Sequence, residues 1–469
     1  MSEKLWLEAL GISIAWVLSW RLHSPKSRQI LLLGSSYLFY AGFALWFPAV
    51  LLGSTFMNYA WGSYLRRRPT VGRLWGGVAL NLLLLGIFKY MPGIAGTWSQ
   101  QSLLAAKLTQ IVLPIGVSFW TFQALSYLFD VYRDQNLDPS WLEFCLYMGF
   151  GPTLLSGPIC RLPDMLPQFR TVRTREWSET RRGLQRIWLG VFMMTLARIL
   201  GAGLLPGQGI DAGFELTNLG GIDVWLLAVG YGFQLFFDFA GYSHIAIGTA
   251  LLFGFRLPEN FHLPYLSTSP SEFWTRWHMS LSFWIRDYVF LPLATLRREL
   301  WWRNLSLVIS MVVFGLWHKA KLALVVWGAY HGVLLVLHRL WRQTQRRFGF
   351  EWSGRLAALI SWMVTFLVIC LGWIFFREPS LKRAITMVSS ALSPSSYGVL
   401  SLAPRYYVLV AATIAGYFLV IALRAWSAPS DESVFSWIPI ELRLACYAGM
   451  LYLVLFHVAE PQAFIYFQF

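Results

Sequence analysis

Long apolar runs constrain the fold of this 469-residue chain more than any other feature. Runs of about 20 apolar residues, the length that crosses a bilayer core as a helix, recur along the whole sequence. Charged residues make up only 13% of the chain, whereas a soluble domain carries roughly 25%. The first run, residues 5–20, lacks a small-residue cleavage site and is expected to be a span rather than a signal peptide. The sequence therefore predicts an all-α polytopic membrane protein.

The basic residues indicate the orientation of these spans. The net charge is +15, and the Lys and Arg residues lie in short loops such as RLHSPKSR, RRRPTVGR, RTVRTREWSETRRGLQR and HRLWRQTQRR. Basic loops of this kind face the cytoplasm. Membrane topology thus accounts for the charge, so we expect membrane lipids and no nucleic acid as partners. We further expect location in the inner membrane of a bacterium, with the C-terminus in the periplasm.

Breaks in the apolar pattern predict irregular segments at membrane depth. A helical hairpin is expected over residues 30–65, with its turn near Pro48. The stretch GPTLLSGPICRLP contains two Gly-Pro pairs that do not fit a regular helix. Such backbone survives in a membrane only where protein or a water-filled cavity surrounds it. We also expect two separate short spans over residues 224–237 and 240–253.

Polar residues concentrate between residues 238 and 338, first in SPSEFWTRWHMSLSFWIRDYVFLPL. Read as one helix, this stretch has an aromatic stripe next to a polar stripe. An amphipathic helix at the membrane interface is the alternative to a functional site. The aromatic stripe consists of Trp277, Leu281, Trp284 and Tyr288, and the polar stripe of Thr275, His278, Ser282 and Arg286.

A second polar cluster, FGLWHKAKLALVVWGAYHG, holds His318 and His331. Imidazole can act as a general base near neutral pH, and the chain has no GxSxG, P-loop or HExxH motif to suggest another chemistry. His331 could instead be a hydrogen-bonded core residue, and His318 could lie at the cytoplasmic edge. The histidines and the four cysteines show no metal-ligand spacing, so no metal site is expected.

Four stretches together resemble the membrane-bound O-acyltransferase (MBOAT) family, in its alginate O-acetyltransferase (AlgI-like) branch. They are SFWTFQALSYLFDVYR, residues 241–293 with FWTRWHMSLSFWIRDY, RNLSLVISMVVFGLWHKA and WGAYHGVLLVLHR. The resemblance implies one domain over residues 1–469, with about 11 transmembrane helices plus re-entrant and amphipathic helices around a central tunnel. Length and the WHKA variant, with Lys319 where the family has Gly, are most similar to the cellulose-acetylation (WssH-type) members.

The resemblance also implies roles for individual residues. His318 matches the signature histidine, and His278 the second catalytic position, which family members fill with Asn or His. Tyr466, in the aromatic segment FIYFQF at residues 464–469, resembles a tyrosine that relays the acyl group; an aromatic belt at the interface is the alternative. Substrate binding or positioning is expected of Trp277, Ser282, Arg286, Asp287, Trp317 and His331. Arg286 and Asp287 are expected to form an ion pair.

The expected function is acetyl transfer outward across the membrane for O-acetylation of an exopolysaccharide, cellulose or, as the alternative, alginate. Acetyl-CoA or another acyl thioester is the expected donor, and no bound cofactor is expected. A periplasmic SGNH-hydrolase-like protein of the AlgJ or AlgX type and a polysaccharide synthase complex are the expected partners. The rival function of another class is a lipid or glycan transporter, and a third possibility is a catalytically silent scaffold.

Overall fold

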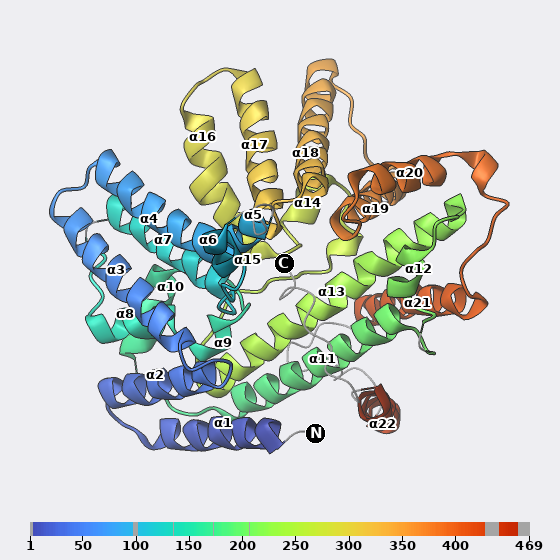
Figure 1. Cartoon of the computed structure of the whole chain (residues 1–469). Helices are drawn as coiled ribbons and strands as arrows, with labels where there is room; N and C mark the ends of the chain where they lie inside the picture. Colours follow the sequence, from blue (N-terminus) through green and yellow to red (C-terminus); the bar gives the residue numbers. More distant parts are fainter. Residues whose placement is uncertain are drawn as a thin grey trace. The chain divides into compact units, whose positions relative to one another are not determined.

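The computed structural model describes residues 3–96, 102–134, 136–171, 173–205, 207–426 and 440–457, and its helices are labelled in Figure 1. The predicted C-terminal motif with Tyr466 lies outside these residues. The described chain is helical apart from loops and one isolated antiparallel bridge between Phe261 and Trp277. It divides into two compact units, the first formed by residues 1–187 and 246–259, the second by residues 188–245 and 260–469.

Seven described helices are long and apolar enough to cross a membrane, and shorter or less apolar helices lie between them. This confirms the predicted all-helical polytopic fold. The seven are α4 (Val71–Lys89), α11 (Trp177–Ala202), α13 (Gly221–Leu252), α17 (Leu300–His318), α18 (Leu322–Phe348), α19 (Arg355–Arg377) and α21 (Pro404–Trp426).

The first unit begins with α1 (Glu3–Arg21), α2 (Pro25–Ala41) and α3 (Phe47–Arg67), which are followed by α4. The hairpin expected over residues 30–65 is confirmed, with Pro48 in the first turn of α3. Buried Asn58 of α3 and Asn81 of α4 donate amide hydrogen bonds to each other at 3.0 and 2.7 Å. This reciprocal pair fixes the register of α3 against α4, because a buried amide group must form its hydrogen bonds within the protein.

The Gly-Pro stretch has the irregular backbone that the sequence predicts. It forms the short helix α9 (Gly151–Leu154), and residues 155–161 then follow without regular structure and almost completely buried. Gly116, at the start of α7 (Val117–Arg133), has a φ of 85°, and a Cβ there would lie 2.1 Å from the carbonyl oxygen of Leu154. Protein atoms therefore surround this irregular segment, as a chain at membrane depth requires.

The two short spans expected at residues 224–237 and 240–253 are wrong, because α13 is one continuous helix of 32 residues. Asp238 lies between the two expected spans, but neither Asp238 nor Gly241 interrupts the backbone hydrogen bonds of a helix as proline does. Gly241 instead allows α11 to approach. A Cβ at Gly190 of α11 would lie 2.4 Å from the carbonyl oxygen of Gly241, so glycine serves close packing here.

Side chains of the first unit cap the C-terminal end of α13. The indole nitrogens of Trp16 and Trp20 donate to the carbonyl oxygen of Leu252 at 2.8 and 2.9 Å. The buried guanidinium of Arg28 donates to the carbonyl oxygen of Phe253 and lies over the Trp20 ring. A cation at this position is favourable, because the last carbonyls of a helix carry partial negative charge.

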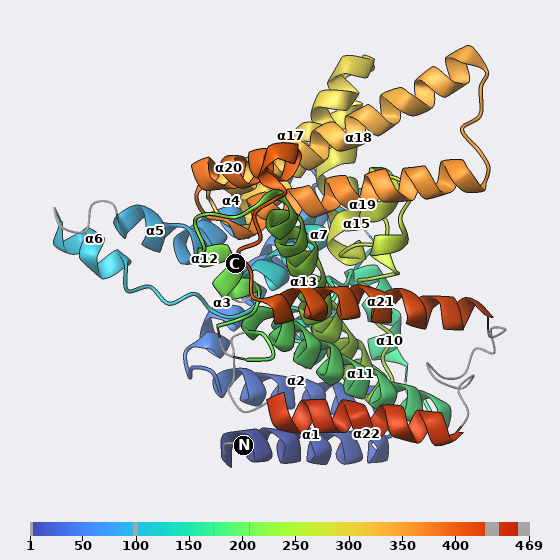
Figure 2. The same cartoon turned by 90° about the vertical axis from the view of Figure 1, so that its right-hand side faces the viewer.

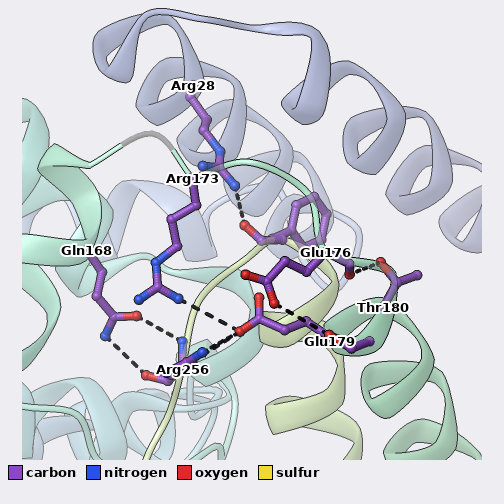
Figure 3. A network of polar contacts seen from close by, with 9 residues as sticks. Arg28, Gln168, Arg173, Glu176, Glu179, Thr180 and Arg256 are labelled. Carbon is purple, nitrogen blue, oxygen red and sulfur yellow. Dashed lines mark hydrogen bonds and ion pairs between the residues drawn. The ribbon is translucent and has the colours of Figure 1, made fainter.

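The loop that follows α13 is held by a polar network (Figure 3). The amide side chain of Gln168 bonds both the backbone nitrogen of Arg256, at 2.9 Å, and its carbonyl oxygen, at 3.1 Å. The Arg256 guanidinium donates to the buried carboxylate of Glu179 at 2.6 Å. Farther along the loop, Glu259 pairs with Arg186 of α11. These contacts therefore fix the backbone of the loop up to Glu259.

In the second unit α17 and α18 form a closely packed antiparallel hairpin (Figure 1, Figure 2). A Cβ at Gly315 would lie 2.1 Å from the carbonyl oxygen of Leu324, so the helices touch backbone to backbone. His318 ends α17, and the basic end of α18 near Arg339 lies 17 residues after its start, about 26 Å along the helix. This separation is close to the thickness of a bilayer core, so a cytoplasmic edge for His318 and a cytoplasmic HRLWRQTQRR loop are competing predictions.

Candidate active site

His318 is the last residue of α17 and is buried in a cage of aromatic rings. Its ring centroid lies 4.6 Å from that of Trp317, 4.9 Å from Phe376 and 5.8 Å from Trp327. Phe314, one helical turn earlier, stacks on it at 5.3 Å. Such a cage keeps water away from the ring, and a neutral imidazole has one nitrogen that can accept a proton from a hydroxyl.

His331 of α18 is fully buried on the other side of Trp327, whose ring lies 5.0 Å from it. The Trp274 ring lies edge-on at 5.2 Å. The burial of His331 agrees with the core position that was considered as the alternative to a role in substrate binding. Its ring nitrogens have no hydrogen-bond partner within the described part of the chain, contrary to the hydrogen-bonded core histidine that we considered. Gly372 of α19 faces the ring, and a Cβ there would lie 2.7 Å from Nε2.

The segment from residue 270 to residue 290 is not the single amphipathic helix that the stripes predict. It comprises α14 (Pro270–Trp274), a break at residues 275–278, α15 (Met279–Ile285) and a π-helical turn, Arg286–Phe290. The aromatic stripe is confirmed as a buried face, because all four of its members are at most 5% exposed. The polar stripe is wrong: His278 is fully buried, whereas Thr275 and Arg286 are exposed.

His278 lies in the break between α14 and α15 and has the left-handed backbone φ of 42°. Its ring meets the Phe239 ring of α13 edge-on at 4.5 Å. The neighbouring Trp277 contacts Trp373 at 4.8 Å, and Trp373 in turn lies 6.3 Å from Trp327. A chain of contacting rings thus joins the segment that carries His278 to the cage of His318.

The other predicted positioning residues lie along the same segment. Ser282 donates to the carbonyl oxygen of Trp277 at 2.9 Å, which supports the backbone just before His278. Arg286 and Asp287 form the predicted ion pair, with Nε 2.7 Å from Oδ1. The Arg286 side chain is 55% exposed, so this pair is not a buried one. Both residues lie in the π-helical turn Arg286–Phe290, and such turns are frequent at functional sites.

Cations gather beyond the end of α17. Burial first, and then the charges of Lys321 and Arg377, lower the pKa of Lys319 from its ordinary value. Arg377, at the end of α19, pairs with Asp211 at 3.2 Å. Lys319 therefore places a half-buried ammonium directly after the His318 cage.

Three contributors to the site were missed in the sequence. They are Asn260, Trp373 and Phe376, each buried and in contact with the segments of His278 or His318. A buried asparagine in such an apolar chain is a signal that could have been used. The two aromatic residues lie in an ordinary apolar run, and no periodicity marks them. Among the described residues no group of three His, Cys, Asp or Glu side chains could hold a metal ion.

Comparison with known proteins identifies the family. The model of the membrane-bound O-acyltransferase family matches residues 97–378, which include the cage, His278 and His331. The chain belongs to this family. It is therefore a multi-pass membrane O-acyltransferase, as predicted.

Individual relatives agree with this assignment. The probable alginate O-acetylase AlgI of Pseudomonas aeruginosa is 36% identical over 385 residues, covering 79% of this chain and 71% of the relative. The peptidoglycan O-acetyltransferase of Helicobacter pylori is 30% identical over 399 residues, covering 78% and 74%. The teichoic acid D-alanyltransferase of Streptococcus thermophilus is 36% identical over 283 residues, covering 57% and 64%. The predicted similarity to the AlgI-like branch is confirmed.

Proposed function

We propose that this protein moves acetyl groups from a cytoplasmic thioester, acetyl-CoA, across the inner membrane for O-acetylation of an exopolysaccharide. The observation that carries the proposal is the buried His318 in its ring cage, within a chain similar to AlgI proteins over most of its length. Cellulose is the proposed polymer, because length and the WHKA variant resemble the cellulose-acetylation type. Alginate is the second candidate, since AlgI relatives carry alginate in their names.

The chemistry follows from a base in a dry site. His318 takes the proton of an acceptor hydroxyl as the hydroxyl oxygen attacks the thioester carbonyl. The carbon–sulfur bond then breaks, and the thiol leaves with the proton that the imidazole returns. Exclusion of water by the cage disfavours hydrolysis of the thioester. His278 assists as the second catalytic residue, and a hydrogen-bond donor must face the developing oxyanion.

The acceptor hydroxyl is proposed to be the phenol of Tyr466. Three phenylalanines surround it in FIYFQF, so the segment can enter an aromatic-lined funnel. The acetyl ester on Tyr466 would then pass to a periplasmic SGNH-hydrolase-like partner of the AlgJ or AlgX type, which places it on the polymer near the synthase complex. This direction requires the C-terminus in the periplasm.

The test measures acetyl ester on the polymer in a strain that produces each variant at a verified level. His318→Ala should lower acetylation by about 100- to 10,000-fold, the usual cost of losing a general base. Tyr466→Phe should abolish it, because only the hydroxyl is removed. His23→Ala and Tyr452→Phe, which change an exposed histidine and an exposed tyrosine, are the matched controls. Wild-type acetylation with His318→Ala would refute the proposal.

The same strains separate the enzyme from a transporter. A lipid or glycan transporter needs no base at His318, so a defect caused by His318→Ala in a transporter would appear as reduced export and not as loss of acetyl groups from the exported polymer. In the enzyme, polymer export should continue with His318→Ala while the exported polymer lacks acetyl groups. Acetyl ester on the peptide that contains Tyr466, removable by hydroxylamine, would identify the relay directly.

A further inference from the structure

His278 lies in a small antiparallel ladder that joins two segments of the second unit. The backbone nitrogen of His262 donates to the carbonyl oxygen of Arg276 at 3.0 Å, and Phe261 is bridged to Trp277. In a regular ladder the return bond to Asn260 would come from His278. The backbone nitrogen of Met279, one residue farther along, donates to the carbonyl oxygen of Asn260 at 2.9 Å, so His278 and Met279 together lie opposite Asn260 in a β-bulge.

The backbone of His278 carries the conformational mark of this bulge. Its φ of 42° and ψ of 52° are left-handed, a conformation that costs free energy for a residue with a Cβ. Among the described non-glycine residues, only Leu263 shares a positive φ, and it follows the same ladder directly. Strain of this kind persists only where surrounding contacts impose it, and it gathers at functional sites.

The side chain of Asn260, opposite the bulge, is fully buried. Its Oδ1 accepts from the hydroxyl of Ser280 at 2.6 Å and from the Ser280 backbone nitrogen at 3.4 Å. Its Nδ2 donates to the hydroxyl of Ser243 on α13 at 3.0 Å. Asn260 thus ties the residues that follow His278 to α13, the helix whose Phe239 packs on the His278 ring.

We propose that Asn260 is a positioning residue of the acyl transfer: its side chain holds the bulge that aims the His278 imidazole. This rests on the proposed role of His278 as the second catalytic residue. The carboxamide suits the task because it accepts on one side and donates on the other. An aspartate keeps the acceptor toward Ser280 and loses the donor toward Ser243, whereas alanine loses both.

The experiment compares Asn260→Ala and Asn260→Asp, each in the wild-type and in the His278→Ala background. The readout is transfer of radiolabelled acetyl, normalised to the folded protein in the membrane. Asn260→Ala should lower transfer by about 100-fold, the cost of displacing a catalytic group by about 1 Å. Asn260→Asp should recover part of it. Adding Asn260→Ala to His278→Ala should cause no further loss, because the aim of an absent imidazole has no effect.

Asn81→Ala is the matched control, since it removes another fully buried asparagine with hydrogen-bonded partners. It should lower the amount of folded protein and leave transfer per folded molecule unchanged. If the Asn260→Ala protein does not accumulate, the Ser280→Ala variant takes its place in both backgrounds. Ser280→Ala removes the hydroxyl that donates to Asn260 Oδ1. Wild-type transfer with these variants, or a full multiplicative loss in the His278→Ala background, would overturn the positioning role.

The two ideas fail in different ways. If His278→Ala alone transfers acetyl at the wild-type rate, the proposed role of His278 is wrong, and the positioning role that rests on it is overturned too. If His278→Ala is impaired and Asn260→Ala is not, only the positioning role of Asn260 is wrong.

Discussion

Replacement of His331 is the sharpest test of which histidines do chemistry. The ring is fully buried between Trp274 and Trp327, it faces Gly372, and no described residue bonds its nitrogens. Truncating a buried aromatic ring to alanine costs about 3–5 kcal/mol through lost contacts and the cavity left behind. Removing a buried polar group without a partner regains about 1–3 kcal/mol. The central values of these two ranges leave a net destabilisation of the His331→Ala fold of about 2 kcal/mol.

His331→Leu separates packing from polarity. Leucine refills most of the space, leaves no polar atom to satisfy and is shorter than histidine toward Gly372. The thermal midpoint of the His331→Leu protein should therefore equal or exceed that of the wild type, while the midpoint of His331→Ala falls. Size-exclusion chromatography of heated detergent extracts measures both midpoints.

Activity decides the role of His331. If the residue only packs, acetyl transfer per folded molecule should stay within a few-fold of wild type in both variants. Gly372→Ala is the matched control, because its Cβ pushes on the same ring from α19 without changing the histidine. A His331→Leu protein with a normal thermal midpoint and no acetyl transfer would refute the packing role and make His331 a member of the catalytic machinery.

Two further predictions concern charged pairs outside the cage. Because Arg286 is half exposed, losing either charge of the Arg286–Asp287 pair should cost about 1 kcal/mol or less, and exchanging the two charges should recover part of the protein level lost; immunoblots that show no recovery would contradict the pairing. Burial alone would raise the pKa of Glu143, but hydrogen bonds from Arg170 and Ser140 hold it below its ordinary 4.5. The first turn of α8 (Trp141–Met148) should therefore be stable above about pH 4.5 and lose stability as the pH falls through the lowered pKa of Glu143. Hydrogen exchange of this turn would show the loss, and Glu143→Gln should remove the pH dependence.

Apolar run length predicted the helices of this protein well, because in a bilayer each backbone group must bond within its own segment. The error at α13 has a physical cause. Asp238 lowers the local hydropathy between the two expected spans, so the sequence read alone favours a break there. In the fold, Asp238 is buried and Gly241 packs against Gly190, so contacts with other helices outweigh the local signal.

The residues of the site were easier to predict than its geometry. His318 and its neighbour Trp317 stand out locally, at the end of an apolar run. The rings of Trp373 and Phe376 that complete the cage come from a helix more than 50 residues later, and no local pattern reports such a contact. The prediction of one amphipathic helix around Trp277 was wrong at the break before α15. Helical periodicity can only be read if the helix is assumed to be continuous.

The bulge at His278 fits the two residue types, Asn and His, that the family resemblance implies for this position. Asparagine and histidine are among the non-glycine residues most enriched at positive φ. A left-handed backbone at residue 278 therefore restricts the choice before any chemistry is considered, and the need for a polar, hydrogen-bonding side chain excludes glycine. On this reasoning His278→Asn should keep the bulge, and any loss of transfer in that variant measures the imidazole itself. A β-branched residue such as valine at this position should disrupt the ladder between Asn260 and Met279 as well.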